Sequence, residues 1–180
     1  MPDIIVAERG GVSSKWKDNG DGSWAQQVAS NAKSNIVDVT LSLDTSIYAS
    51  GDVMADTQVV TGAMRVTDGT GTLESIVVFD EDDQGVAFDL VFFSANRSLG
   101  TENSAPNISD ANARDILGIV SIASADFVDL GGVRIANKVK IGMPVRAATG
   151  TADIYVGAIS RGTPTYTASG VRLRLGFFQD

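Results

Sequence analysis

The sequence contains no cysteine and no histidine. The absence of cysteine excludes disulfide bonds, thiolate metal sites and cysteine nucleophiles. The absence of histidine excludes Ser-His-Asp catalysis and imidazole ligation of zinc, iron or copper. The side chains that most hydrolases and metalloenzymes depend on are therefore missing. We expect no enzyme activity, no catalytic residues, no cofactor and no metal.

The sequence also lacks a long apolar run. No stretch approaches the roughly 20 apolar residues of a membrane span. The first residues, Met1-Pro2-Asp3, have neither the basic flank nor the apolar centre of a signal peptide. We expect a protein that is made in the cytosol and does not contact a membrane.

Basic residues are few, with 14 Lys and Arg against 22 Asp and Glu and a formal net charge of −8. Nucleic acid repels such a chain unless it carries a local basic patch. The most basic stretches are residues 134–140, where the basic residues are spaced out, and the pair Arg172 and Arg174. We therefore expect no direct contact with nucleic acid, and the charge favours solubility.

The residues that are abundant favour strands. Nineteen glycines, together with many Val, Thr and Ser residues, indicate an all-β fold. A chain of 180 residues buries about 70% of its unfolded surface when it folds, which is enough for one core. We divide it into an N-terminal arm, residues 1–35, and a body, residues 36–180.

The arm contains one clear element, a β-hairpin. Its turn is Asp18-Asn19-Gly20-Asp21-Gly22, because Asn-Gly and Asp-Gly accept the positive φ angles of tight turns. Trp16 and Trp24 flank the turn and could stack across the two strands. The hairpin either covers a sheet edge of its own body or binds a partner, with the tryptophans as aromatic anchors. Residues 25–35 are either a short helix or a linker.

The body alternates strands with turns. Residues 37–43 alternate apolar and polar side chains, which is typical of a strand with one buried side. Residues 94–114 are polar and predict a long loop, with Ser109 capping a short helical turn. The pattern predicts an antiparallel β-sandwich or jelly-roll-like body, with a barrel as the other possible architecture. Further strands are predicted at residues 58–66, 73–79, 86–93, 116–123, 126–130, 133–135, 139–141, 154–159 and at the C-terminal end.

Two of these strands carry candidate partner-binding residues. Residues 86–93 are apolar on both faces, so Phe93 is expected in the core or at a subunit contact. In the last strand, Val171, Leu173, Leu175 and Phe177 share one face. Arg172 and Arg174 therefore point the other way, either into solvent or toward acidic neighbours across a sheet or a subunit boundary.

Three patterns could carry chemistry, and each has a simpler structural interpretation. Residues 80–85 resemble the front of a calcium loop, but the twelfth position would be Val91, which cannot ligate, so a solvated turn is favoured. Asp126 and Asp129 are interpreted as polar ends of a strand. Gly131-Gly132 precedes a strand and not a helix, which disfavours a phosphate-binding loop.

Three stretches of the body resemble a known family. They are residues 41–57 (LSLDTSIYASGDVMADT), residues 121–132 with Asp126-Phe127-Val128-Asp129-Leu130-Gly131-Gly132, and the ending Arg161-Gly162-Thr163-Pro164-Thr165-Tyr166 with Leu173-Arg174-Leu175-Gly176. With these stretches the body resembles the decoration, or cement, proteins of tailed bacteriophage capsids.

This resemblance implies a β-sandwich or jelly-roll protein of the virion that binds the capsid exterior. It implies the major capsid protein as partner, self-association as a trimer, and synthesis in the cytoplasm of a bacterial host. Such a protein clamps neighbouring capsid subunits, and repeated weak contacts over a lattice provide avidity.

Two other functions stay open. One is a head spike, fibre base or tail component that recognises a host surface, which copy number in the virion would distinguish. The other is an enzyme such as a carboxylate-dependent glycosidase, which would need a cleft with two facing acids.

Overall fold

The computed structural model describes residues 4–9, 12–18, 21, 23–27 and 33–179. The chain divides into two compact units, Met1–Ala32 and Lys33–Asp180. The sequence placed this division three residues later, after residue 35.

The first unit is a three-stranded antiparallel sheet in the order β1-β2-β3. Its strands are Ile4–Arg9, Val12–Asp18 and Trp24–Gln27. Strands β2 and β3 form the expected hairpin, and β1 adds a strand that the sequence did not indicate. The prediction of a helix or linker from residue 25 was wrong at both ends, because β3 extends to Gln27 and β4 begins at Lys33.

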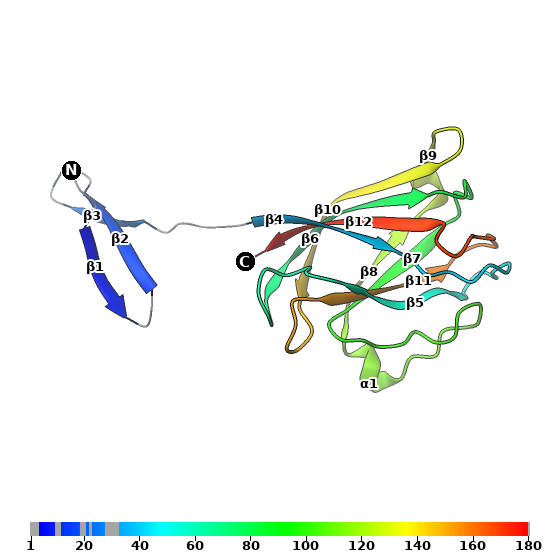
Figure 1. Cartoon of the computed structure of the whole chain (residues 1–180), viewed down its shortest axis with the longest axis horizontal. Coiled ribbons are helices and arrows are strands. Elements are labelled where there is room, and N and C mark those ends of the chain that lie inside the picture. The colour runs from blue at the N-terminus through cyan, green and yellow to red at the C-terminus, as the bar shows by residue number, and fades with distance from the viewer. Residues whose placement is uncertain (1–3, 10–11, 19–20, 22, 28–32, 180) are drawn as a thin grey trace. The chain divides into compact units, whose positions relative to one another are not determined.

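The second unit, which we call the body, is a sandwich of two antiparallel sheets (Figure 1). The five-stranded sheet has the order β4-β12-β6-β10-β9, and the four-stranded sheet has the order β5-β11-β7-β8. The strands are β4 (Lys33–Thr40), β5 (Val53–Val60), β6 (Thr70–Asp80), β7 (Phe88–Phe93), β8 (Ile116–Ile122), β9 (Phe127–Asp129), β10 (Arg134–Arg146), β11 (Ile154–Ser160) and β12 (Val171–Gln179).

The path of the chain through the sheets is that of a jelly roll. From β4 to β7 each successive strand lies in the opposite sheet, and β10, β11 and β12 alternate in the same way. The last strand, β12, returns to lie between β4 and β6. The all-β, jelly-roll-like body is therefore confirmed, with nine described strands where the sequence indicated about eight.

Alternating side chains build the core between the sheets. Along β12, Val171, Leu173, Leu175 and Phe177 are buried, while the residues between them point outward. Ile76 and Val78 of β6 lie beside them in register. On the facing sheet, buried residues of β5, β7 and β11 complete the same cluster. One apolar side per strand is enough for this arrangement, because each sheet contributes a single face to the core.

Two predicted strands differ from the structure. The strand expected at residues 58–66 is β5, which begins at Val53 and ends before a turn at Gly62, where φ is +67°. The short strands expected at 133–135 and 139–141 are one strand, β10, with an irregularity between Val139 and Met143. Pro144 does not end this strand, because β9 pairs with β10 only as far as Ala136 and proline is tolerated where a strand has one neighbour.

The long connection after β7 contains the expected helical turn. Helix α1, Asp110–Ala113, begins after Ser109, whose hydroxyl accepts a hydrogen bond from the Asn112 amide. A serine at this position satisfies an amide that the first turn of a helix leaves free. The prediction of a polar loop with a Ser109 cap is confirmed.

Candidate interaction surface

Part of the outward side of the four-stranded sheet is covered by the chain itself, while Val59 and Ile119 on the same side are 46% and 57% exposed. Phe93 and Val91 of β7 point away from the main core and pack with Val53 and Leu99 in a second buried cluster. Leu99 lies in the loop that follows β7. Phe93 has no exposed surface. Of the two positions expected for Phe93, core or subunit contact, this chain shows the core, and the side chain offers no surface to a partner.

Asp56 of β5 holds this loop in place. Its carboxylate accepts hydrogen bonds from the Leu99 amide at 2.7 Å and from the Ser98 hydroxyl at 2.8 Å. Burial acts to raise the pKa of Asp56, but the bonds from Ser98, Thr57 and Leu99 outweigh it and hold the pKa below its ordinary value. The charged carboxylate thereby stabilises the loop over the sheet.

The outward side of the five-stranded sheet carries more exposed apolar side chains. The register aligns the outward residues in four rows across the strands, and we call this set the outer face. The rows are Thr40, Arg172, Phe79, Ile135 and Val128; then Asp38, Arg174, Val77 and Asn137; then Ile36, Gly176, Ser75 and Val139; then Ser34, Phe178, Thr72 and Pro144.

Four apolar side chains of the outer face are half or more exposed: Ile36 at 67%, Val128 at 60%, Val139 at 59% and Phe178 at 50%. Single exposed apolar residues are ordinary, whereas several on one sheet face mark a contact surface. Sequence reasoning did not single out these four. The signal available in the sequence was alternation, because each of the four lies next to residues that point to the buried side of the same strand.

Two arginines lie among these apolar side chains. The Arg174 guanidinium donates two hydrogen bonds to Asp38 and lies 5.4 Å from the ring centroid of Phe79. The bond from Arg174 holds the pKa of the Asp38 carboxyl below its usual range, and the same bond raises the pKa of Arg174. Arg172 forms an ion pair with Glu81, with 3.4 Å between Nη2 and Oε1. Both arginines point outward as predicted, and of the two environments left open for them the structure shows pairing with acidic neighbours.

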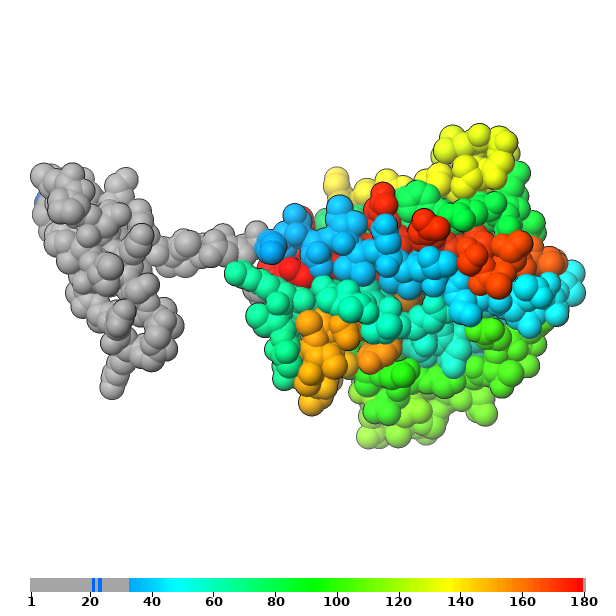
Figure 2. Space-filling view, in the orientation of Figure 1, coloured from blue at the N-terminus to red at the C-terminus, as the bar shows by residue number. Residues whose placement is uncertain are grey.

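Figure 2 shows part of the body surface, where β4 (blue) lies beside β12 (red) on the side turned to the viewer. The turn between β9 and β10 (yellow) stands out from the body at one end of the same sheet. The outer face is thus made of strands from the beginning, middle and end of the body.

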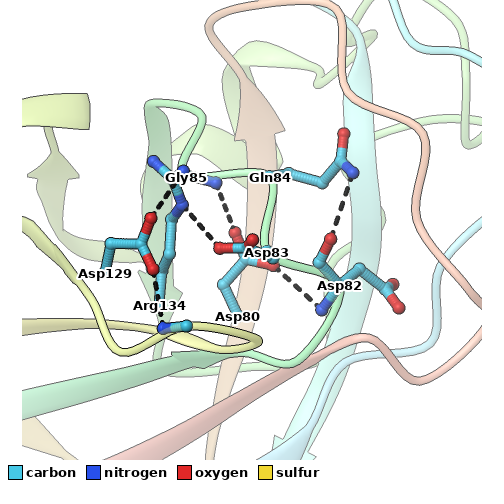
Figure 3. Close-up of polar contacts among 8 residues, drawn as sticks. Asp80, Asp82, Asp83, Gln84, Gly85, Asp129 and Arg134 are labelled. Carbon is cyan, nitrogen blue, oxygen red and sulfur yellow. Dashed lines mark hydrogen bonds and ion pairs between the residues drawn. The ribbon is translucent and has the colours of Figure 1, made fainter.

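The turn after β6 carries the residues that resembled a calcium loop, and their oxygens bind the protein itself (Figure 3). Asp80 accepts hydrogen bonds from the amides of Gly85 at 2.6 Å and Asp82 at 3.2 Å. The Asp82 carboxylate in turn accepts from the Thr167 amide at 2.6 Å. These bonds join the turn to the loop before β12, which is the structural role that the sequence favoured.

Arg134 links the same turn to β9. Its guanidinium lies 2.7 Å from Asp83 and 3.2 Å from Asp129 (Figure 3). Asp126 pairs with Lys138 at 2.5 Å, and that bond lowers the pKa of Asp126. Both acids that could have formed a glycosidase pair are therefore neutralised by basic residues of β10. Within the described residues, no group of three or more Asp and Glu residues is arranged to hold a metal ion.

Asp80, at the start of this turn, and Tyr166, in the loop before β12, are both buried. Burial raises the pKa of Asp80, even though its backbone hydrogen bonds act in the opposite direction. Burial and the charge of Asp80 also raise the pKa of Tyr166. The Tyr166 hydroxyl has no hydrogen-bond partner among the described residues. A buried hydroxyl without a partner costs free energy, so the Tyr166 hydroxyl lowers the stability of the body.

A polar cleft of about 530 Å³ lies where β6 begins and β10 ends. Arg97 and Arg146 line it together with Asn96, Asp68 and Asp115. Arg97 is paired with Asp115 at 2.7 Å. The cleft offers both donors and acceptors, and it is lined mainly by polar groups.

The backbone of the first unit places the two tryptophans. The register of β2 and β3 pairs Trp16 with Gln26 and Trp24 with Asp18, so the tryptophans are not direct cross-strand partners. Their side chains lie outside what the structure describes, and stacking between them stays a prediction.

No protein-family model matches the sequence, and no curated protein matches it. Among solved structures, the chain is similar to VP2 of infectious bursal disease virus in a subviral particle, with 12% identity and a TM-score of 0.37. The match covers 90% of this chain and only 36% of the VP2 chain. It is also similar to a Desmodium yellow mottle tymovirus structure, with 10% identity, a TM-score of 0.29, and coverage of 100% of this chain and 96% of that chain. At these values the similarity assigns no function to this chain.

The described part of the chain has no helix that is long and apolar enough to span a membrane.

Proposed function

We propose that this chain is a structural virion protein that binds the outside of a phage capsid and stabilises the lattice of the major capsid protein, as a cement protein. The observation that carries the proposal is the outer face of the five-stranded sheet. Its exposed apolar residues surround two arginines, whereas the chain's own loop covers the part of the other sheet around Phe93. Apolar and aromatic residues with arginine are the composition that protein interfaces favour.

The charge of the outer face supports contact with an apolar protein surface. The four rows contain Arg172 and Arg174 but only one acid, Asp38, in a chain with a net charge of −8. Because Asp38 and Glu81 pair with these arginines, the face is close to neutral and thus less acidic than the molecule as a whole, and an apolar surface on the capsid would complement it.

The size of the outer face supports binding to a repeating lattice. Five strands about 4.8 Å apart and four rows about 7 Å apart give a face of roughly 500–600 Å². A standard interface buries about 800 Å² on each partner, so a single contact of this size is weak. Several copies held together bind a lattice far more tightly than one copy does. A trimer on the capsid surface fits this requirement.

The N-terminal unit is a second element of the proposal. Trp16 and Trp24 would anchor it to the capsid or to a neighbouring copy, because tryptophan is enriched at binding hot spots. Deletion of residues 2–30 removes only residues of the first compact unit and none of the body. We expect lower capsid occupancy or a changed oligomer, and unchanged values of both would remove the tryptophans from the proposal.

The first test is the copy number of this chain in purified virions, measured by quantitative mass spectrometry against the major capsid protein. A ratio near one to one supports a lattice-wide cement protein. A few copies per particle would contradict it and indicate a spike, fibre base or tail role. Absence from virions would contradict every virion function.

The second test places the contact. Phe178→Asp puts a charge in the outer face. Ile47→Asp makes the same kind of change at a residue between β4 and β5 that is also exposed, at 65% against 50% for Phe178. We expect Phe178→Asp to lower cosedimentation with capsids that lack the protein by tenfold or more, and Ile47→Asp to bind normally. Equal binding by the two variants would exclude the outer face.

One observation favours the second function, recognition of a host surface. The cleft lined by Arg97, Arg146 and Asn96 mixes donors and acceptors, as polyhydroxyl ligands such as sugars require. Arg146→Ala would abolish binding to host-cell glycans in that function and would leave capsid occupancy unchanged in the cement function.

A further inference from the structure

The four-stranded sheet ends at a strand edge without the usual protection. β8, Ile116–Ile122, is the outermost strand of this sheet, and among the described strands only β7 pairs with it. Its sequence, ILGIVSI, has no charged residue and no proline. A sheet edge presents unpaired amide and carbonyl groups, and proteins normally shield such an edge with charges, proline, short length or a covering segment.

The other three edges of the sandwich have these protections. β9 is only three residues long and ends at Asp129. β4 carries Lys33 and Asp38. β5 is covered at its start, because the Val53 amide donates to the Ser104 carbonyl at 2.8 Å and the Asn103 amide donates to the Val53 carbonyl at 2.9 Å. Among the four described edges of the sandwich, β8 is protected only by an irregularity at Leu117, and its regular part from Gly118 to Ile122 has no charge, no proline and no paired covering segment.

The residues of β8 are arranged for pairing with an identical strand. Ile119 is at its centre and is 57% exposed. β8 has an irregularity at Leu117, and antiparallel pairing of its regular part in two copies about Ile119 sets Ile119 opposite itself and Gly118 opposite Val120. Each of these contacts is apolar, and no like charges meet, although each chain carries a net charge of −8.

We propose that β8 pairs antiparallel with β8 of a second copy of this chain, with Ile119 on the twofold axis, so that two four-stranded sheets become one eight-stranded sheet. The contact uses hydrogen bonds along the backbone and the apolar pairs on either side of them. It is isologous, because the same residues contribute from both copies.

This contact is independent of the proposed function and uses a different surface. A twofold contact cannot build a threefold ring. Pairing through β8 would therefore occur in addition to any trimer contact. Pairing through β8 doubles the mass of whatever the rest of the chain forms: one chain of 18.8 kDa becomes two, and a trimer becomes a hexamer.

The first experiment measures mass by light scattering during size-exclusion chromatography of the full chain over a range of concentrations. Ile119→Lys places a charge at the edge on an exposed side chain, and Ile47→Lys is the matched control on another exposed isoleucine. We expect wild type and Ile47→Lys to have twice the mass of Ile119→Lys. Added salt should strengthen the wild-type association, because it screens the repulsion between two acidic chains.

The second experiment uses the absence of cysteine from the chain. A single cysteine in Ile119→Cys faces its own copy across the twofold axis at a separation that a disulfide can bridge, about 4.5–5.5 Å between Cα atoms. We expect mild oxidation to convert Ile119→Cys to a covalent dimer and to leave Ile47→Cys as single chains. Circular dichroism confirms that each variant is folded.

The proposal is overturned if wild type and Ile119→Lys have the same mass at every concentration and Ile119→Cys crosslinks no faster than Ile47→Cys. If the masses agree but Ile119→Lys loses capsid binding, the second copy is again excluded, and the edge belongs to a strand of another protein.

Discussion

Arg174 of β12 and Asp38 of β4 are 136 residues apart in the sequence and form two parallel hydrogen bonds, from Nε to Oδ1 at 2.8 Å and from Nη2 to Oδ2 at 2.9 Å. The forked geometry of the guanidinium matches the carboxylate and fixes its plane. Both side chains are about half exposed, so the pair adds little to stability. Its main effect is to hold the guanidinium over Phe79 and set the shape of the outer face.

The first prediction concerns the titration of Asp38. The bond from Arg174 lowers the pKa of Asp38, so this bond stabilises the fold above the ordinary pKa of 3.8 and is lost as the pH falls through the lowered value. We expect Arg174→Gln to raise the pKa of Asp38 toward its ordinary value, as measured by NMR titration of the carboxyl carbon. Arg172→Gln is the control and should change it less, because Arg172 acts on Asp38 only through its charge. Equal effects would contradict the forked pair.

The second prediction compares two phenylalanines. Phe93 has no exposed surface and packs under Leu99, so Phe93→Ala should lower the free energy of unfolding by about 3–5 kcal/mol. Phe178 is half exposed on the outer face, and Phe178→Ala should cost less than about 1 kcal/mol. Urea denaturation measures both. A soluble Phe93→Asp protein with a native melting temperature and assembly state would show that Phe93 is not in the core.

The third prediction concerns the loop over the four-stranded sheet. Asp56→Ala removes the acceptor for the Leu99 amide and the Ser98 hydroxyl, and should cost about 1–3 kcal/mol. Hydrogen exchange should rise in the loop at residues 97–104 and stay unchanged in β12. Because the pKa of Asp56 is lowered, wild type should lose the same protection as the pH falls through that pKa. Uniform exchange across the body would instead indicate global destabilisation.

The fourth prediction concerns a hydroxyl without a partner. Tyr166→Phe removes the unpartnered hydroxyl and should raise the free energy of unfolding by about 1 kcal/mol. Tyr48→Phe is the matched control. The single proton of the Tyr48 hydroxyl is shared between the carbonyls of Asp44 at 3.1 Å and Met54 at 3.0 Å, so loss of the hydroxyl should cost about 0.5–1.5 kcal/mol. Opposite signs for the two variants are the expected result, and a destabilised Tyr166→Phe would show that this hydroxyl is bonded.

The sequence by itself determined the features that depend on neighbouring residues. Alternation along 171–177 predicted which side of β12 is buried, because successive strand residues point to opposite faces. Ser109 predicted the start of α1, because the serine oxygen reaches an amide three residues later. The turn residues 18–22 predicted the hairpin of β2 and β3, since only a few residue types accept its backbone angles.

The tertiary structure alone decided which faces are covered. Phe93 and Phe178 are both outward residues of apolar strands, yet Leu99 covers one, and the other is half exposed. It also decided that residues 134–146 form one strand, because β6 continues alongside through the irregularity near Lys140. Strand pairing and coverage join segments that are far apart in the chain, such as Asp38 and Arg174, and the alternation of residues within one strand carries no information about its neighbours.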